Sequence, residues 1–152
     1  MIAFRWPNRK KRGATLVETA LVLPVILVVM ITIVEYSRYY YIQSVLFNSA
    51  REGARYGIVR PGDTAGITNA ARRYLVGLGE GNVNVAMSYP NPNNPSQCNP
   101  NLPTNGDPIR VTVSYRTRLL IPYPFGKTLN LIRKSEMQIE SQWPSGVAYT
   151  CP

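Results

Sequence analysis

The chain has 152 residues, with 17 Lys and Arg against 8 Asp and Glu, and a formal net charge of +9. It contains no histidine, the commonest general base and metal ligand, so neither an enzyme nor a cofactor is expected. The basic excess is concentrated before Gly13, where Arg5, Arg9, Lys10, Lys11 and Arg12 occur without an acidic residue. A basic cluster beside an apolar segment usually sets membrane orientation, so no nucleic-acid partner is expected.

Residues 14–34 read ATLVETALVLPVILVVMITIV and carry a single charge, Glu18. A helix of this length spans about 30 Å, the thickness of the hydrocarbon core of a bilayer. The preceding basic residues predict a cytoplasmic N-terminus and an extracytoplasmic remainder. The apolar run is long for a secretory signal and no small-x-small cleavage site follows it, so we expect a retained single span. Pro24 lies inside the run and is expected to kink the helix.

Helical periodicity continues from residue 35 to about residue 59. Ala, Gly and Ser recur there at three- and four-residue spacing, a pattern that favours close helix contact. Arg51, Glu52 and Arg55 fall on the other faces. Two interpretations stay open for them: a solvated helix surface or contact with an assembly partner.

The remaining residues predict a small head. "RPGD" ends the long helix, and Asp63 or Thr64 caps a second helix over 65–78, whose apolar face is expected to hold Ile67, Ala70, Ala71, Tyr74 and Leu75. Alternation predicts strands at 82–89, 109–121 and 135–143, separated by an irregular Pro- and Asn-rich loop over 90–108 and by a turn at "PYPFG". The sequence therefore predicts an α+β fold: a long N-terminal membrane-spanning helix, then one helix and an antiparallel sheet of about three strands. The expected domains are a basic leader (1–13), a transmembrane helix (14–34), its continuation (35–59) and an extracytoplasmic head (60–152).

Cys98 and Cys151 are the two cysteines of the chain. Outside the cytoplasm such a pair is expected to form one disulfide. The bond would close a loop of about fifty residues, worth roughly 4 kcal/mol in loop-entropy models. The alternative is two free thiols.

"RGATLVETALVLP" followed by "EYSRYYYIQSVLFNSAREGARYGIV" resembles the TadE-like family, small pilin-like proteins of tight-adherence (Flp-type) pilus machineries. The resemblance covers about residues 12–59. It implies processing by a prepilin peptidase between Gly13 and Ala14, which makes Glu18 the fifth residue of the mature chain. It also implies that the Glu18 carboxylate pairs with the new Ala14 amino group of a neighbouring subunit and sets register. The implied partners are the peptidase, other pilins and the inner-membrane assembly platform.

Two functional hypotheses follow. In the first, the protein is a minor pilin or pseudopilin with a structural role, held in the bacterial inner membrane with its head outside. In the second, it is a permanently anchored single-pass envelope protein whose basic head binds polysaccharide, DNA or another envelope protein. Glu18 would then lie at the cytoplasmic edge of a plain anchor, and Gly13 would be an incidental turn residue.

Overall fold

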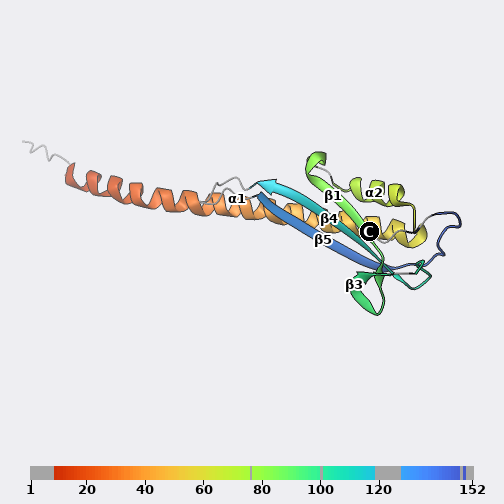
Figure 1. Cartoon of the computed structure of the whole chain (residues 1–152). Helices are drawn as coiled ribbons and strands as arrows, with labels where there is room; N and C mark the ends of the chain where they lie inside the picture. The colour runs from red at the N-terminus through yellow and green to blue at the C-terminus, as the bar shows by residue number, and fades with distance from the viewer. Residues whose placement is uncertain (1–8, 76, 100, 119–127, 148, 150–152) are drawn as a thin grey trace, which may run out of the picture. The chain divides into compact units, whose positions relative to one another are not determined.

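The computed structural model describes residues 9–75, 77–99, 101–118, 128–147 and 149, with the backbone alone for residues 9–12, 14 and 80. The predicted fold class is confirmed. A long helix, α1 (Arg9–Val59), is followed by a short helix, α2 (Thr64–Arg72), and by a three-stranded antiparallel sheet (Figure 1). The internal contacts of the chain divide it into two units, Met1–Arg38 and Tyr39–Pro152.

Helix α1 ends at Val59 because the next residues cannot continue it. Pro61 lacks a backbone N–H, and Gly62 has a φ of 93°, in the left-handed region that glycine adopts without a side-chain clash. At the other end the helix begins at Arg9, so part of the predicted basic leader is helical. The helix also passes through Pro24 without interruption.

The second unit is built on one face of α1. Ile42, Leu46, Ala50 and Ala54 are buried at four-residue spacing, which places them on a single stripe of the helix. Gly53 lies beside this stripe, and a Cβ built there would be 3.1 Å from Cβ of Ala71 in α2. The small residues of α1 therefore make their close contacts within the chain, against α2 and the sheet.

Helix α2 begins where the sequence predicts but is shorter. Asp63 is its N-cap, since its side chain accepts a hydrogen bond from the Gly66 amide. Ile67 and Ala71 are buried, as predicted, whereas Tyr74 lies beyond the end of the helix and is 49% exposed. The prediction of Tyr74 on the packed face was therefore wrong, because α2 stops at Arg72.

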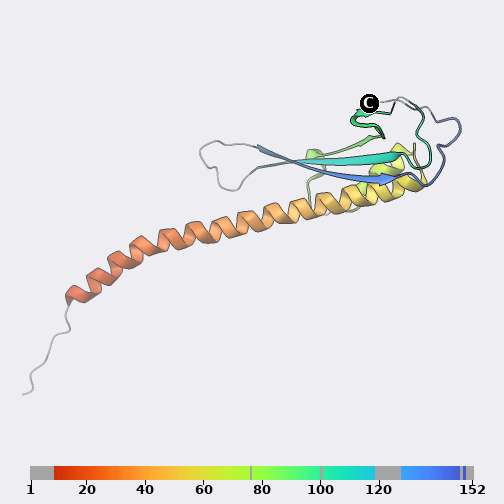
Figure 2. The ribbon, with the colours of Figure 1, turned by 90° about the horizontal axis from the view of Figure 1, so that it is seen from below.

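The sheet has the strand order β1 (Val83–Ser88), β4 (Pro108–Arg118) and β5 (Thr128–Gln138). Burial alternates along β4, where the predicted inward residues Ile109, Val111, Val113 and Tyr115 are all buried. Contacts of Val111 and Ile109 with the Gly53 and Gly57 positions place this face against α1. Figure 2 shows the sheet running beside the orange-to-yellow part of α1.

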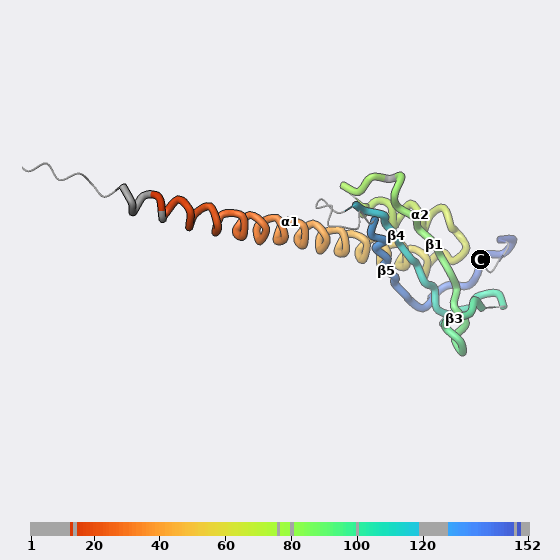
Figure 3. The backbone as a smooth tube through the Cα atoms, turned by 60° about the vertical axis from the view of Figure 1, so that its left-hand side comes forward, coloured from red at the N-terminus to blue at the C-terminus, as the bar shows by residue number. Residues whose placement is uncertain are grey.

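Two sequence predictions in the head were wrong in detail. The third strand spans Thr128–Gln138 rather than 135–143, because the register with β4 places Arg118 opposite Thr128 and Pro108 opposite Gln138. The loop expected to be irregular contains a two-stranded hairpin, β2 (Pro90–Asn91) and β3 (Asn94–Cys98), which projects beyond the end of β1 (Figure 3). Its tight turn is stabilised by the Asn91 side chain, which accepts a hydrogen bond from the Asn93 amide. The predicted "PYPFG" turn lies outside the described residues.

Candidate functional site

The apolar part of α1 is exposed on every side. Large side chains from Leu16 to Val34 are between about half and three-quarters exposed, and one span candidate, Thr15–Val59, is long and apolar enough to cross a membrane. A helix that is apolar all round needs an apolar environment. This element therefore fits a single-pass membrane protein.

Hydroxyl groups in this region are satisfied within the helix. Thr19 Oγ1 donates to the Thr15 carbonyl at 2.8 Å, and Thr32 Oγ1 donates to the Val28 carbonyl at 2.7 Å. Ser37 Oγ makes the same contact with the Ile33 carbonyl at 2.8 Å. Such bonds to the carbonyl four residues earlier remove the cost of an unpaired hydroxyl in hydrocarbon.

The predicted cleavage and register residues lie near the start of α1. Gly13 and Glu18 are exposed, and nothing lies within 4 Å of a Cβ built at Gly13. The Gly13–Ala14 peptide bond is helical, so a peptidase would have to unwind it locally. Glycine lowers the stability of a helix interior by about 1 kcal/mol relative to alanine, which makes this position one of the easiest to open. Cleavage at this bond and pairing of Glu18 stay predictions.

The structure places the predicted contact residues in two settings. Arg51 is exposed. Glu52 and Arg55 form an ion pair of 3.3 Å and line a groove between α1 and α2. We call this the α1–α2 groove, and its walls are formed by Glu52, Arg55, Tyr56, Val59, Arg60, Ala70, Arg73 and Tyr74. Sequence reasoning missed Arg73 and Tyr74, because only the packing of α2 brings them beside Arg55. It also missed Arg60, which follows the last residue of α1 and contacts Tyr56.

One corner of this groove is stabilised by Asp63. Gly66 N–H donates to Asp63 Oδ1 at 2.8 Å, and the Tyr56 hydroxyl donates to Asp63 Oδ2 at 2.9 Å. The Gly66 hydrogen bond first, then the Tyr56 hydrogen bond and the charge of Arg60, lower the pKa of the Asp63 carboxyl against the opposing effect of burial. Arg60 also lies 5.8 Å from the centre of the Tyr56 ring. This cluster joins the end of α1 to the start of α2 and holds two groove residues in place.

Cys98 lies at the end of β3, next to the last described part of the chain. The Tyr149 hydroxyl is 3.3 Å from Cys98 Sγ and donates to the Asn99 carbonyl at 2.6 Å. Burial raises the pKa of this hydroxyl, so it stays protonated as a donor at neutral pH. Tyr89, Trp143 and Tyr149 pack edge to face, with ring centres 5.3 to 5.8 Å apart. Cys151 lies outside the described residues, and its pairing with Cys98 stays a prediction.

Among the described residues, no group of three or more His, Cys, Asp or Glu side chains is arranged to hold a metal ion.

These features fit a single-pass membrane protein with a small α+β head. Comparison with protein families then identifies its N-terminal part: residues 13–55 match the model of the TadE-like protein family. The match begins at Gly13 and includes Glu18, the apolar run and the predicted contact residues up to Arg55, which confirms the resemblance over less than a third of the chain. It supports a protein associated with the Tad pilus that interacts with other pilus components in a membrane context. No curated protein and no solved structure matches the chain.

Proposed function

We propose that this protein is a minor pilin or pseudopilin in the assembly of a tight-adherence (type IVc) pilus or a related secretion system. The observation that carries the proposal is the TadE-like match over residues 13–55. The match begins at Gly13, just before the exposed apolar part of α1 and its early carboxylate, Glu18. The role is structural rather than enzymatic. The major filament subunits of these systems, as the resemblance implies, lack a head of this size, so an accessory role fits better.

The proposed assignment of the chain follows the predicted domains. Residues 1–13 are the cytoplasmic leader, residues 14–34 span the inner membrane, residues 35–59 continue the helix, and residues 60–152 lie outside the cytoplasm. A prepilin peptidase removes the leader at the inner face, and helix packing then seats the subunit among other pilins and the assembly platform. The α1–α2 groove, with Arg55 and Glu52, is the proposed contact surface for those partners, since Tyr and Arg are enriched where protein interfaces bind most strongly.

The proposal is tested by the mass of the N-terminus with and without a coexpressed prepilin peptidase. We expect residues 1–13 to be lost only when the peptidase is present. Gly13→Val should block processing, because a branched side chain at the cut hinders entry into the peptidase cleft. Gly79→Val is the matched control, since Gly79 also has nothing within 4 Å of a built Cβ. An intact leader in the wild-type chain beside an active peptidase would contradict the proposal and favour the permanently anchored alternative.

The second test separates processing from assembly. A carboxylate in an apolar helix costs roughly 2.5 to 3.5 kcal/mol near the bilayer centre, and a partner amine would offset part of that cost. We expect Glu18→Ala to be cut normally but to fail to incorporate with the pilus machinery, as measured by cofractionation. Glu140→Ala, which removes an exposed carboxylate outside the apolar run and outside the α1–α2 groove, is the control. Normal incorporation of Glu18→Ala would show that this carboxylate does not set the register.

A further inference from the structure

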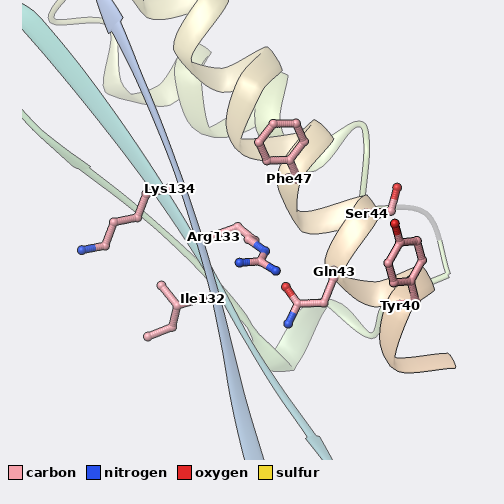
Figure 4. A pocket seen from close by; sticks show the side chains of 7 residues that line it. All are labelled: Tyr40, Gln43, Ser44, Phe47, Ile132, Arg133 and Lys134. Atoms are coloured by element: carbon pink, nitrogen blue, oxygen red, sulfur yellow. The ribbon is translucent and has the colours of Figure 1, made fainter. Parts of the chain in front are cut away.

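A second groove in the Tyr39–Pro152 unit lies between α1 and the edge strand β5. We call it the α1–β5 groove. It has a volume of about 850 Å³ and is lined by Tyr40, Gln43, Ser44 and Phe47 from α1 and by Ile132, Arg133 and Lys134 from β5. Figure 4 shows Arg133 directed from β5 toward Gln43, while Ile132 and Lys134 lie on the other side of the strand. The groove thus combines apolar surface with positive charge.

The apolar residues of this groove are not covered by the fold. Tyr40 is 66% exposed, Ile132 is 50% exposed and Phe47 is 49% exposed. Large apolar side chains gathered on a surface commonly mark a site of interaction with another molecule or with a membrane. A molecule that binds in this groove must therefore carry apolar groups as well as a negative charge.

The positive charges are available for an external anion. Within the described part of the chain, the side chains of Arg133 and Lys134 form no hydrogen bond and no ion pair. The acidic residue nearest along the strand, Glu136, is paired with Arg110. An arginine whose guanidinium group has no acceptor within the protein is well suited to form a bidentate pair with a phosphate.

Gln43 adds a polar side chain whose oxygen lacks a hydrogen-bond donor. Its Oε1 atom is buried and has no hydrogen-bond partner among the described residues, and a buried polar atom left unpaired is costly. The amide presents donors as well as this acceptor. A ligand carrying both phosphate oxygens and hydroxyl groups would satisfy it.

The chain keeps this groove close to the membrane. Tyr40 follows Val34, the last residue of the apolar run, by six positions, and six residues span at most about 20 Å even when fully extended. The headgroup layer of the bilayer begins where the apolar run ends. An anionic lipid is therefore the occupant whose charge, acyl chains and location all match the groove.

From these observations we propose that the α1–β5 groove binds the headgroup of an anionic phospholipid of the phosphatidylglycerol type. Arg133 binds the phosphate, Gln43 bonds a headgroup hydroxyl, and Tyr40 and Phe47 contact the upper acyl chains, while Lys134 adds attraction from the other side of the strand. This inference rests on one part of the proposed function, namely that the chain is anchored in a membrane. Failure of leader processing would leave it intact.

The experiment measures which lipids the full-length protein retains. The protein is purified in neutral detergent and incubated with equal amounts of phosphatidylglycerol and phosphatidylcholine, and the bound lipids are counted by native mass spectrometry. We expect a preference for phosphatidylglycerol that falls about 25-fold in Arg133→Gln/Lys134→Gln, because each of the two cations contributes about a fivefold gain near an anionic surface. Arg72→Gln/Arg73→Gln is the control: it removes the same charge from exposed positions in and just after α2 and should keep the preference.

Every other outcome contradicts the inference. An unchanged preference in Arg133→Gln/Lys134→Gln would show that the groove does not bind the lipid, and would leave an acidic protein segment as its occupant. An equal fall in both double variants would show a general effect of net charge. Displacement of the lipid by excess inorganic phosphate would show that the groove takes a free anion. The basic residues before Gly13 are common to all variants, so they do not affect the comparison.

Discussion

At the scale of single residues, this protein depends on positions where a small side chain permits close packing. Gly57 is the tightest of them, since a Cβ built there would overlap Cδ1 of Ile109 and lie 3.3 Å from Cδ1 of Ile67. Both isoleucines are fully buried. Interiors packed to crystal-like density have little room for an added methyl group, so the glycine is needed for the fold.

We therefore expect Gly57→Ala to lower the free energy of unfolding by about 1 to 2 kcal/mol, because overpacking exceeds the gain in helix propensity. The loss should shrink in an Ile109→Val background, which removes the overlapping methyl group. Thermal unfolding of the full-length chain in detergent measures both effects, with Gly79→Ala as a control in open space. Equal losses in the two backgrounds would show that Ile109 is not the clashing group.

Asp63 gives a prediction for pH. Its pKa is lowered in the folded state relative to about 3.9 in an unfolded chain. Stabilisation by the carboxylate is therefore fully present above the unfolded pKa and is lost as the pH falls through the lower folded pKa. We expect the melting temperature of the wild type to drop further below pH 4 than that of Asp63→Asn, which retains a capping oxygen. An equal fall in the melting temperatures of the two proteins below pH 4 would show that the Asp63 carboxylate does not stabilise the fold.

At the scale of elements, the hydrophobic patterns predicted the type of α1, α2, β1, β4 and β5 better than the residues at which they begin and end. β4 could be predicted because its inward residues alternate with polar ones without interruption. The placement of β5 could not be read from its pattern, since Arg133 and Ser135 occupy inward positions opposite Val113 and Val111. An edge strand tolerates such residues, and an inward charge there also discourages pairing with another sheet. Pairing with β4, rather than alternation, sets its register.

The candidate sites also differ in how far they could be predicted from the sequence. Gly13, Glu18 and the apolar run form a local pattern, so the sequence alone suggested them. The α1–α2 and α1–β5 grooves join residues far apart in the chain, such as Arg55 with Arg73 and Gln43 with Arg133. Neither groove can be recognised from the sequence, because the residues that form it come together only when the chain folds. The hairpin at residues 90–98 was also missed, because its Pro and Asn content is typical of loops.

The C-terminal segment provides the prediction at this scale. Tyr149 contacts Cys98 and bonds Asn99, and it precedes Cys151 by two residues in the sequence. The disulfide between Cys98 and Cys151 stays a prediction. We expect both cysteines to resist alkylation until a reductant is added, and Cys151→Ser to lower stability by up to roughly 4 kcal/mol. Alkylation of the unreduced native chain at Cys98 would contradict the pairing.

At the scale of the whole molecule, the charge is distributed so that a membrane would orient the chain. Four of the basic residues lie immediately before Gly13, with no acidic residue among them, and no comparable cluster follows the apolar run directly. The excess of Lys and Arg at one end of a span keeps that end in the cytoplasm. The proposed leader cleavage and the proposed disulfide both require this orientation, because the peptidase acts inside and disulfides persist outside.

We expect a C-terminal reporter that is active only outside the cytoplasm to be active in the wild-type chain. Replacing Arg9, Lys10, Lys11 and Arg12 with Gln should reduce its activity severalfold, as a fraction of the chains inserts in the opposite direction. Replacing Arg116, Arg118, Arg133 and Lys134 with Gln removes equal charge from the sheet and serves as the control. If the control variant loses as much reporter activity as the N-terminal variant, total charge rather than the basic cluster sets the orientation. If neither variant loses reporter activity, the basic cluster does not set the orientation, and translocation of the head determines it instead.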